Sequence, residues 1–379
     1  MKKLLLVLLT VALCGCTGSA PKKEPQGPEA NQLWGEPLRS VALMLPPSEP
    51  EPHALLDIGL VIFDPGVPED PVNNSKLGIF PEIRKAESRY QPYILRENLV
   101  KTQAWGAVRV LPRPDASAEL QLSGKILHSD GSHLVLQVRA VDSTGQVWFD
   151  KVYHDEAVES DYPVIPGNDP YADMYRQISN DILSYSQQLS PAQFKQIREI
   201  ALLQYAASLS PEAFDGFVSA DAEGLLVVNR LPSQDDPMLE RVQRIKNQEF
   251  LFIDNADEQY LELYDRMTPT YNLWRQNGRE LAIYKVEYEA RESSRDRDGR
   301  RGTYAAMQQT YNAYKRSKEH DQDLDELAQG FNNEVAPTVL EVQGKVFRLN
   351  GSLDSQYTEW RSILRSIFAL ETGLPPAAE

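Results

Sequence analysis

Cysteine is almost absent from this chain of 379 residues, which contains only Cys14 and Cys16. The remaining chain has no thiol for a disulfide, a cysteine-ligated metal or a cysteine nucleophile. The five histidines show neither His-x-His nor His-Glu-x-x-His spacing, which argues against a zinc enzyme. The Gly-x-Ser-x-Gly elbow and the glycine-rich phosphate loop are also missing. We therefore expect a protein that is not an enzyme and that carries no metal or cofactor.

Basic residues are scarce, because 39 Lys and Arg stand against 55 Asp and Glu, for a net charge of −16. Such an acidic chain is not expected to bind nucleic acid or an anionic membrane surface. Asp321, Asp323 and Asp325 begin like a calcium loop, but Glu326 and Asn332 occupy the positions that need glycine and a bidentate glutamate. The many acids do not by number identify a glycosidase pair, which depends on their separation in space.

Long apolar runs are lacking except at the start, where two lysines precede an apolar stretch at residues 4–13. Residues 1–15 have the form of a secretory signal peptide and are too short to span a membrane. The next residues resemble the lipobox of bacterial lipoproteins, in which the leader is cut before a cysteine that is then acylated: Leu13-Cys14-Gly15-Cys16. An ordinary leader cut elsewhere is the alternative, but no Ala-x-Ala-like site supports it.

Cys16 is therefore the predicted lipidation site, modified by palmitate or a similar acyl chain. The sequence after it, Thr17-Gly18-Ser19, lacks the aspartate that keeps the lipoproteins it resembles in the inner membrane. We expect the protein to be anchored by its N-terminal lipid in the outer membrane and to face the periplasm.

The chain after the leader has roughly 360 residues, a length typical of two domains. Residues 16–37 are rich in Pro, Lys, Glu, Gln and Asn, which predicts a lipidated cysteine followed by a flexible tether. The α+β chain then divides into a small α/β sandwich-like domain at 38–160 and an elongated all-α antiparallel domain at 161–379.

The first domain should contain about five strands and one or two helices. Short apolar runs bounded by turn residues predict strands at 40–45, 57–63 and 107–111. A helical pattern covers 81–104, where Pro92 is expected to break or kink the helix. Alternating residues predict a hairpin of strands near 119–126 and 133–140, joined by an Asp130-Gly131 turn, and a last strand at 146–153.

This order resembles an α/β domain of bacterial envelope proteins. The resemblance rests on Trp105-Gly106-Ala107-Val108, on the strand at 118–126, and on Val141-Asp142-Ser143-Thr144-Gly145-Gln146-Val147-Trp148. Over about residues 39–158 the chain is similar to the amino-terminal domain of TolB, to the curli secretion lipoproteins and to lipoproteins that activate peptidoglycan synthases. The resemblance implies a binding module and transfers no catalytic residue.

Helical spacing dominates the second domain. Helix starts are predicted at Ser190-Pro191 and Ser210-Pro211, with a capping box completed by Gln193 in the first. Long helical patterns cover 237–267 and, after Pro269, continue to about 292, and further patterns run back from 304 to 331. The last helices are expected to hold Val339, Leu340, Val346 and Phe347, and then residues 357–368.

The hairpin tip of this predicted bundle, residues 291–301, holds five arginines and three acids. We interpret these arginines as a docking site for an acidic partner or a phosphate-bearing glycan, with a solvated loop as the alternative: Arg291, Arg295, Arg297, Arg300 and Arg301. The aromatic residues along the long helices could form a sugar-binding platform, but core packing is the simpler interpretation.

Without a catalytic motif, we expect a noncatalytic outer-membrane lipoprotein that acts as an adaptor in cell-envelope assembly. Its partners would be envelope proteins, with peptidoglycan as a further candidate. One alternative is a periplasmic protein that binds or hydrolyses glycans, which a cleft holding two carboxylates of shifted pKa would favour. The other is an oligomeric secretion channel, although no long amphipathic strand for it is found.

Overall fold

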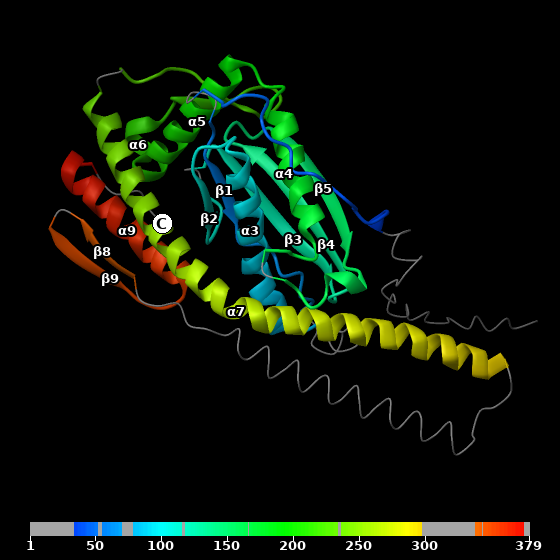
Figure 1. Ribbon diagram of the computed structural model, residues 1–379. Coiled ribbons are helices and arrows are strands. Elements are labelled where there is room, and N and C mark those ends of the chain that lie inside the picture. The colour runs from blue at the N-terminus through cyan, green and yellow to red at the C-terminus, as the bar shows by residue number, and fades with distance from the viewer. Residues whose placement is uncertain are drawn as a thin grey trace, which may run out of the picture.

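The computed structural model describes residues 34–51, 55–69, 79–115, 118–165, 167–233, 236–297, 338–342 and 344–374 (Figure 1). Cys16, and most of the segment expected to run back from the tip, lie outside these residues. No helix among the residues described is both long and apolar enough to cross a membrane.

A five-stranded mixed sheet of order β2-β1-β3-β4-β5 forms the centre of the molecule. Its strands are β1 (Ile58–Val61), β2 (Val108–Leu111), β3 (Leu120–Ser129), β4 (His133–Asp142) and β5 (Val147–Glu156). β1 pairs in parallel with β2 and β3, whereas β3, β4 and β5 form an antiparallel meander. The predicted hairpin is confirmed, because the turn at Asp130 and Gly131 joins β3 to β4 and Gly131 has a φ of 84°.

Helices cover one face of this sheet. α3 (Pro81–Thr102) follows the long crossover from β1, and α4 (Ala172–Ser186) packs beside it and against β5 (Figure 1). Pro92 lies inside α3 without ending it, so of the expected break or kink the break does not occur. The opposite face carries exposed polar side chains, among them Lys125, Arg139 and Asp150, as the alternation in the sequence predicts.

The strand predicted at residues 40–45 does not exist, and this prediction is wrong. The segment is extended, but it lies along α4 instead of pairing in the sheet. Asp173 accepts hydrogen bonds from the backbone N–H groups of Ser40 (2.6 Å) and Val41 (3.1 Å), and Asn180 accepts one from Met44 (2.7 Å). Polar side chains of a helix thus satisfy the backbone groups that a neighbouring strand would otherwise bind.

The second half of the chain is not a separate all-α domain. Its helices share one core with the sheet, since α4 packs on α3 and β5, and α7 packs on β2. It also contains two hairpins, β6 (Val218–Ala220) with β7 (Leu226–Val228), and β8 (Thr338–Val342) with β9 (Lys345–Leu349). The four residues expected in a late helix therefore lie in strands: Val339, Leu340, Val346 and Phe347. The supported description is a mixed α+β fold with further helices.

Several helix boundaries agree with the sequence. α5 (Pro191–Leu209) begins with the predicted capping box, in which the Gln193 N–H donates to Ser190 Oγ and the Gln193 side chain accepts from the Ser190 N–H. α6 (Pro211–Phe214) starts at the second predicted Ser-Pro, and α9 (Leu353–Thr372) covers the last apolar pattern.

α7 (Pro237–Arg297) is one helix of 61 residues. Pro269 lies inside it, and the helix continues through Arg291, Arg295 and Arg297, where a loop was expected from about residue 292. At 1.5 Å per residue it is about 90 Å long. Its first half packs on the body, and its later part extends well beyond the sheet as an arm (Figure 1).

Two glycines allow α7 to cross the β3–β4 turn closely. A Cβ added to Gly278 would lie 2.6 Å from the carbonyl oxygen of Asp130, and one added to Gly131 would collide with the carbonyl oxygen of Arg275. Backbone therefore meets backbone at this crossing, which fixes where the arm leaves the body.

We expect Gly278→Ala to destabilise the protein by about 1–3 kcal/mol, because the added methyl group would overlap the Asp130 carbonyl. In an exposed helix the same change stabilises by about 1 kcal/mol, so the sign is diagnostic. Urea unfolding of the variant beside Glu280→Ala, an exposed position on the same helix, measures the difference. Increased stability of Gly278→Ala would contradict the close crossing.

Candidate functional site

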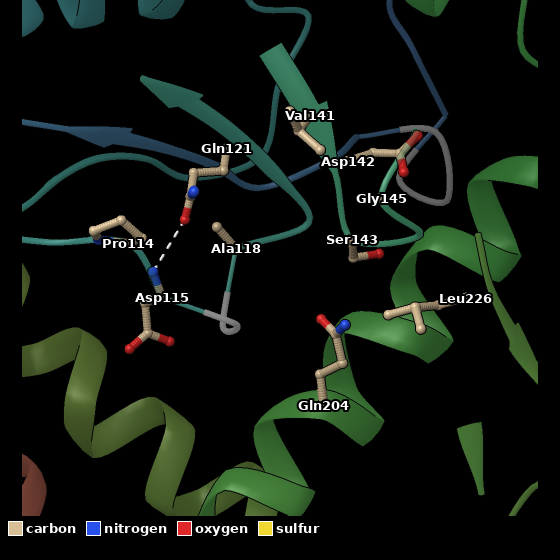
Figure 2. Close-up of a pocket in the computed structure, with 10 residues that line it drawn as sticks. All are labelled: Pro114, Asp115, Ala118, Gln121, Val141, Asp142, Ser143, Gly145, Gln204 and Leu226. Atoms are coloured by element: carbon tan, nitrogen blue, oxygen red, sulfur yellow. Dashed lines mark hydrogen bonds between the residues drawn. The ribbon is translucent and has the colours of Figure 1, made fainter. Parts of the chain in front are cut away.

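A cavity of about 320 Å³ opens at the end of the sheet where β3 begins and β4 ends (Figure 2). Its walls come from the loop after β2, the open sheet face, the β4–β5 turn, α5 and β7. The lining is mostly apolar or uncharged, with these side chains contributing most: Pro114, Ala118, Gln121, Val141, Gln204 and Leu226.

Two glutamine amides line the cavity. Gln121 lies on β3 with its amide directed toward the Asp115 backbone, and Gln204 lies on α5 with its amide pointing toward the sheet (Figure 2). Gln121 Oε1 accepts a hydrogen bond from the Asp115 N–H at 3.0 Å, which leaves its Nε2 for another partner. The Gln204 amide makes no hydrogen bond to another residue in the described part of the chain. The cavity therefore offers both donors and acceptors without charge.

The two carboxylates beside the cavity, Asp142 and Asp115, already bind other groups of the protein. Asp142 Oδ1 accepts from the N–H and hydroxyl of Thr144, and Oδ2 accepts from Trp148 Nε1 at 2.8 Å. This satisfies the tight turn after β4, which is the structural role that the Asp-x-x-Gly spacing indicates. Asp115 points away from the cavity and into the protein, toward α7 (Figure 2). Neither carboxylate is presented to a ligand as a general acid or base.

Asp115 belongs to a buried ionic network behind the cavity. Arg361 of α9 contacts Asp115 Oδ2 at 2.6 Å and Glu249 Oε1 of α7 at 3.6 Å. The Tyr357 hydroxyl lies 2.7 Å from Asp115 Oδ2 and 2.6 Å from Glu249 Oε1, while the Tyr205 hydroxyl donates to Glu249 Oε2 at 2.7 Å. The side chains of Asp115 and Glu249 are 0% and 1% exposed, so this network is closed to solvent.

The hydrogen bonds indicate where a proton sits in this network. Tyr357 has one hydroxyl proton but contacts two carboxyl oxygens, so one contact requires a proton on a carboxyl group. Burial, reinforced by the charge of Asp115, raises the pKa of Glu249 to about 7. We assign this proton to Glu249, and Arg361 contacts both carboxyl groups. The network joins the loop after β2 to α5, α7 and α9.

A second group of charges lies nearby at the start of β1 and β3. Glu119 accepts a hydrogen bond from the Asp57 N–H at 2.9 Å and lies 3.8 Å from Arg198, and burial raises its pKa. Burial also lowers the pKa of Lys246 on α7. These groups neutralise one another and hold α5 and α7 at this edge of the sheet.

Sequence analysis predicted none of this network, because its members are far apart in the chain and follow no spacing. The structure does bring two carboxylates together, one of which, Glu249, has a raised pKa, but it encloses the pair where no substrate reaches. Tyr271 and Trp274, candidates for a sugar platform, are 1% and 3% exposed and belong to the core.

The predicted sites lie elsewhere. Arg291, Arg295 and Arg297 are in the last turns of α7, far along the arm, whereas Cys16, Arg300 and Arg301 are outside the described residues. Sequence analysis also missed a cluster of three histidines, His128, His133 and His154, which adjacent strands bring together. Within the described ranges no group of three or more His, Cys, Asp or Glu is arranged to hold a metal ion.

Comparisons of the chain with known proteins found no match. No family model matches the chain, and neither a curated protein nor a solved structure is significantly similar to it. The resemblance to envelope α/β domains stays a prediction.

We expect Glu249→Gln to weaken the pH dependence of stability. The pKa of Glu249 is about 7 in the folded protein and near 4.5 unfolded, so the folded state binds more protons between these values. Stability must then fall as pH rises through this window. The pKa values of Asp155 and Asp257 are also raised to about 7, so these groups contribute to the same decline in the free energy of unfolding. Glu249→Gln should therefore remove only its own part of that decline, roughly 1–3 kcal/mol.

Urea unfolding at pH 5 and pH 8 measures this difference. Asp254→Asn on the same helix is the control, because that carboxylate is half exposed and pairs with Arg109 at 2.7 Å. Equal pH dependence in Glu249→Gln and the unaltered protein would show that Glu249 is not the proton carrier.

Proposed function

We propose that the chain is a noncatalytic lipoprotein, anchored through Cys16 in the outer membrane, that presents a rigid α+β body and a helical arm to a protein partner in the periplasm. The observation that carries this proposal is the projection of α7 beyond the body (Figure 1). A helix end that extends beyond the described part of the body supports a role in contacting another molecule. Arg291, Arg295 and Arg297 near this end favour an acidic partner surface.

The carboxylates near the cavity support the noncatalytic part of this proposal. The two carboxylates nearest the cavity serve a turn and a buried network, and the closed network has no opening for a substrate. The N-terminal end of the described chain lies on the surface at β5, from which residues 16–33 can reach a membrane. An adaptor needs these two features, a tethered body and a surface that reaches away from it.

Site-specific photocrosslinking in intact cells tests this proposal. A photoreactive amino acid at Arg291 should form an adduct with one envelope protein, and the same residue at Glu258, exposed on α7 beside the body, should not. Cys16→Ser should abolish the adduct by releasing the protein from the membrane. Equal crosslinking at both positions, or an adduct that survives Cys16→Ser, would contradict the proposal.

A second candidate function, glycan binding, is favoured by the cavity. A volume of about 320 Å³ lies at the lower end of the range of ligand pockets. Two amides among mostly uncharged lining residues suit a neutral ligand that both donates and accepts hydrogen bonds, such as an N-acetylated sugar. This candidate requires binding alone and no hydrolysis.

Calorimetric titration with a chitin oligosaccharide, as a soluble N-acetylated glycan, tests the cavity. We expect Gln204→Leu to weaken binding at least fivefold, because the acetamide group of the sugar loses the glutamine amide as its hydrogen-bond partner. Gln187→Leu, at the exposed C-cap position that follows α4, is the matched control. Absence of binding, or an equal effect of both variants, would exclude this candidate and leave the adaptor proposal unaffected.

A further inference from the structure

Three of the five histidines gather beneath the start of the described chain, and His128 and His154 are buried there. His128 lies near the end of β3, His133 begins β4 and His154 lies near the end of β5, so strand pairing places them side by side. The ring of Trp34 packs on two of them, with centroids 4.7 Å from His128 and 5.7 Å from His154. The first residue of the described chain is thus seated on the histidine cluster.

Hydrogen bonds run from the cluster to the backbone next to Trp34. His154 Nδ1 lies 2.8 Å from the carbonyl oxygen of Gly35, so this nitrogen must carry the proton and donate it. His154 Nε2 is then an acceptor in the neutral ring, and His133 Nδ1 donates to it at 3.1 Å. A second proton on His154 would turn its Nε2 into a donor facing another donor, which breaks this chain of bonds.

Residues 34–45, which we call the strap, continue from this point across α4 (Figure 1). The Leu38 N–H donates to the carbonyl oxygen of His154 at 2.8 Å, and Arg39 pairs with Glu156 at 3.1 Å. Farther along, Asp173 and Asn180 hold the backbone of the strap through the bonds described above.

The strap is held mainly by polar bonds and covers little apolar surface. Met44 and Leu45 are 41% and 61% exposed, and Arg39 is 72% exposed. Few buried apolar contacts mean that such a segment separates from the body at a lower free energy than the sheet unfolds. The histidine contacts are therefore a large part of what fixes its first residues.

The charges around the cluster determine its response to acid. Burial lowers the pKa of His133, and His154 and His128 lower it further, although Asp130 and Glu156 act in the opposite direction. A depressed histidine pKa means that the closed form binds fewer protons than the open form. The closed form is therefore favoured at neutral pH and loses stability as pH falls below about 6.5.

Two further acids face this region. Burial opposes the ionisation of Asp130, but His128 at 3.0 Å and the His133 N–H overcome it and hold the pKa of Asp130 low, so it stays charged. Asp155, which faces α4 and accepts from the Met174 N–H, has a pKa raised to about 7 by burial and takes up a proton in the same range. A test must separate Asp155 from the histidines.

We propose that His133 and His154 form an acid-sensitive latch, which holds the strap on the body at neutral pH and releases it when the pair is protonated. Two adjacent imidazolium rings repel one another and leave the Gly35 and Trp34 contacts unsupported. The released strap of twelve residues can extend by up to about 40 Å. If the chain is anchored at Cys16, a point that rests on the proposed function, release lets the body move that much farther from the membrane.

Hydrogen–deuterium exchange of the full chain carrying Cys16→Ser tests the latch. Because intrinsic exchange rates change with pH, the protection of each peptide is calculated relative to the exchange rate of an unstructured peptide at the same pH. Between pH 7.5 and 5.5 we expect the protection of peptides from the strap to fall about tenfold, while that of β4 peptides stays constant. His154→Gln, which can still donate to Gly35 but cannot become charged, should abolish the pH dependence. His133→Gln serves the same purpose if the first variant does not fold.

Asp155→Asn is the control for the other titrating group and should keep the wild-type response. Strap protection that does not change with pH, or that changes equally in His154→Gln, would overturn the latch. This outcome is independent of the crosslinking experiment, because exchange is measured on protein without a lipid anchor or a partner.

Discussion

The structure depends on the attachment of α7 to the sheet through buried charges. Glu87 of α3 accepts from the Ser129 hydroxyl at 2.6 Å and from the Tyr271 hydroxyl at 2.9 Å. One turn along α7, Arg275 pairs with Asp169 at 2.9 Å and lies 4.5 Å from the Tyr271 ring, with its side chain 1% exposed. Removing one partner would leave a buried charge unpaired, which typically costs 3–5 kcal/mol.

This attachment has a counterpart near the other end of the packed part of α7. There Glu249, Asp115 and Arg361 connect α7 to α9 and to the loop after β2. Between the two networks, Phe252 and Ile253 supply apolar contacts that have no directional preference. Because hydrogen-bonded charges require defined partners, the two networks set the register and direction of the helix, and the apolar contacts supply most of the free energy. The direction of the arm follows from both.

Local patterns in the sequence predicted much of the fold. The alternation of apolar and polar residues predicted β3 and β4, and Asp130-Gly131 predicted the turn between them. Ser190-Pro191 predicted the start of α5. These features depend on neighbouring residues alone. Residues 40–45 have the composition of a strand, but the side chains of α4 bind their backbone, a contact more than a hundred residues away in the chain. No local pattern contains that information.

The other errors have related causes. Val339 and Val346 were assigned to a helix because short apolar runs fit both periods, and the Gly344 turn between them was not recognised. At Pro269 the sequence allowed either a new helix or a kink in the old one, and the structure has one helix there, in which Tyr271 and Trp274 are packed in the core. The candidate cavity could not be predicted, since it forms where the sheet meets α5 and β7, far along the chain. The histidine cluster lies on consecutive strands, but which side chains meet depends on the pairing register and its bulges, which alternation alone does not give.

The β3–β4 turn lies between the strap and the arm, the two features on which the proposed adaptor function rests. The Asp130 carboxylate contacts His128 at 3.0 Å and accepts from the His133 N–H at 2.7 Å, which places it beneath the strap. The carbonyl of the same residue faces Gly278, where the arm crosses. A change in protonation of the histidines therefore acts on a turn whose backbone also positions α7. Because both contacts use one residue, the turn can move for the strap only if the crossing at Gly278 adjusts with it.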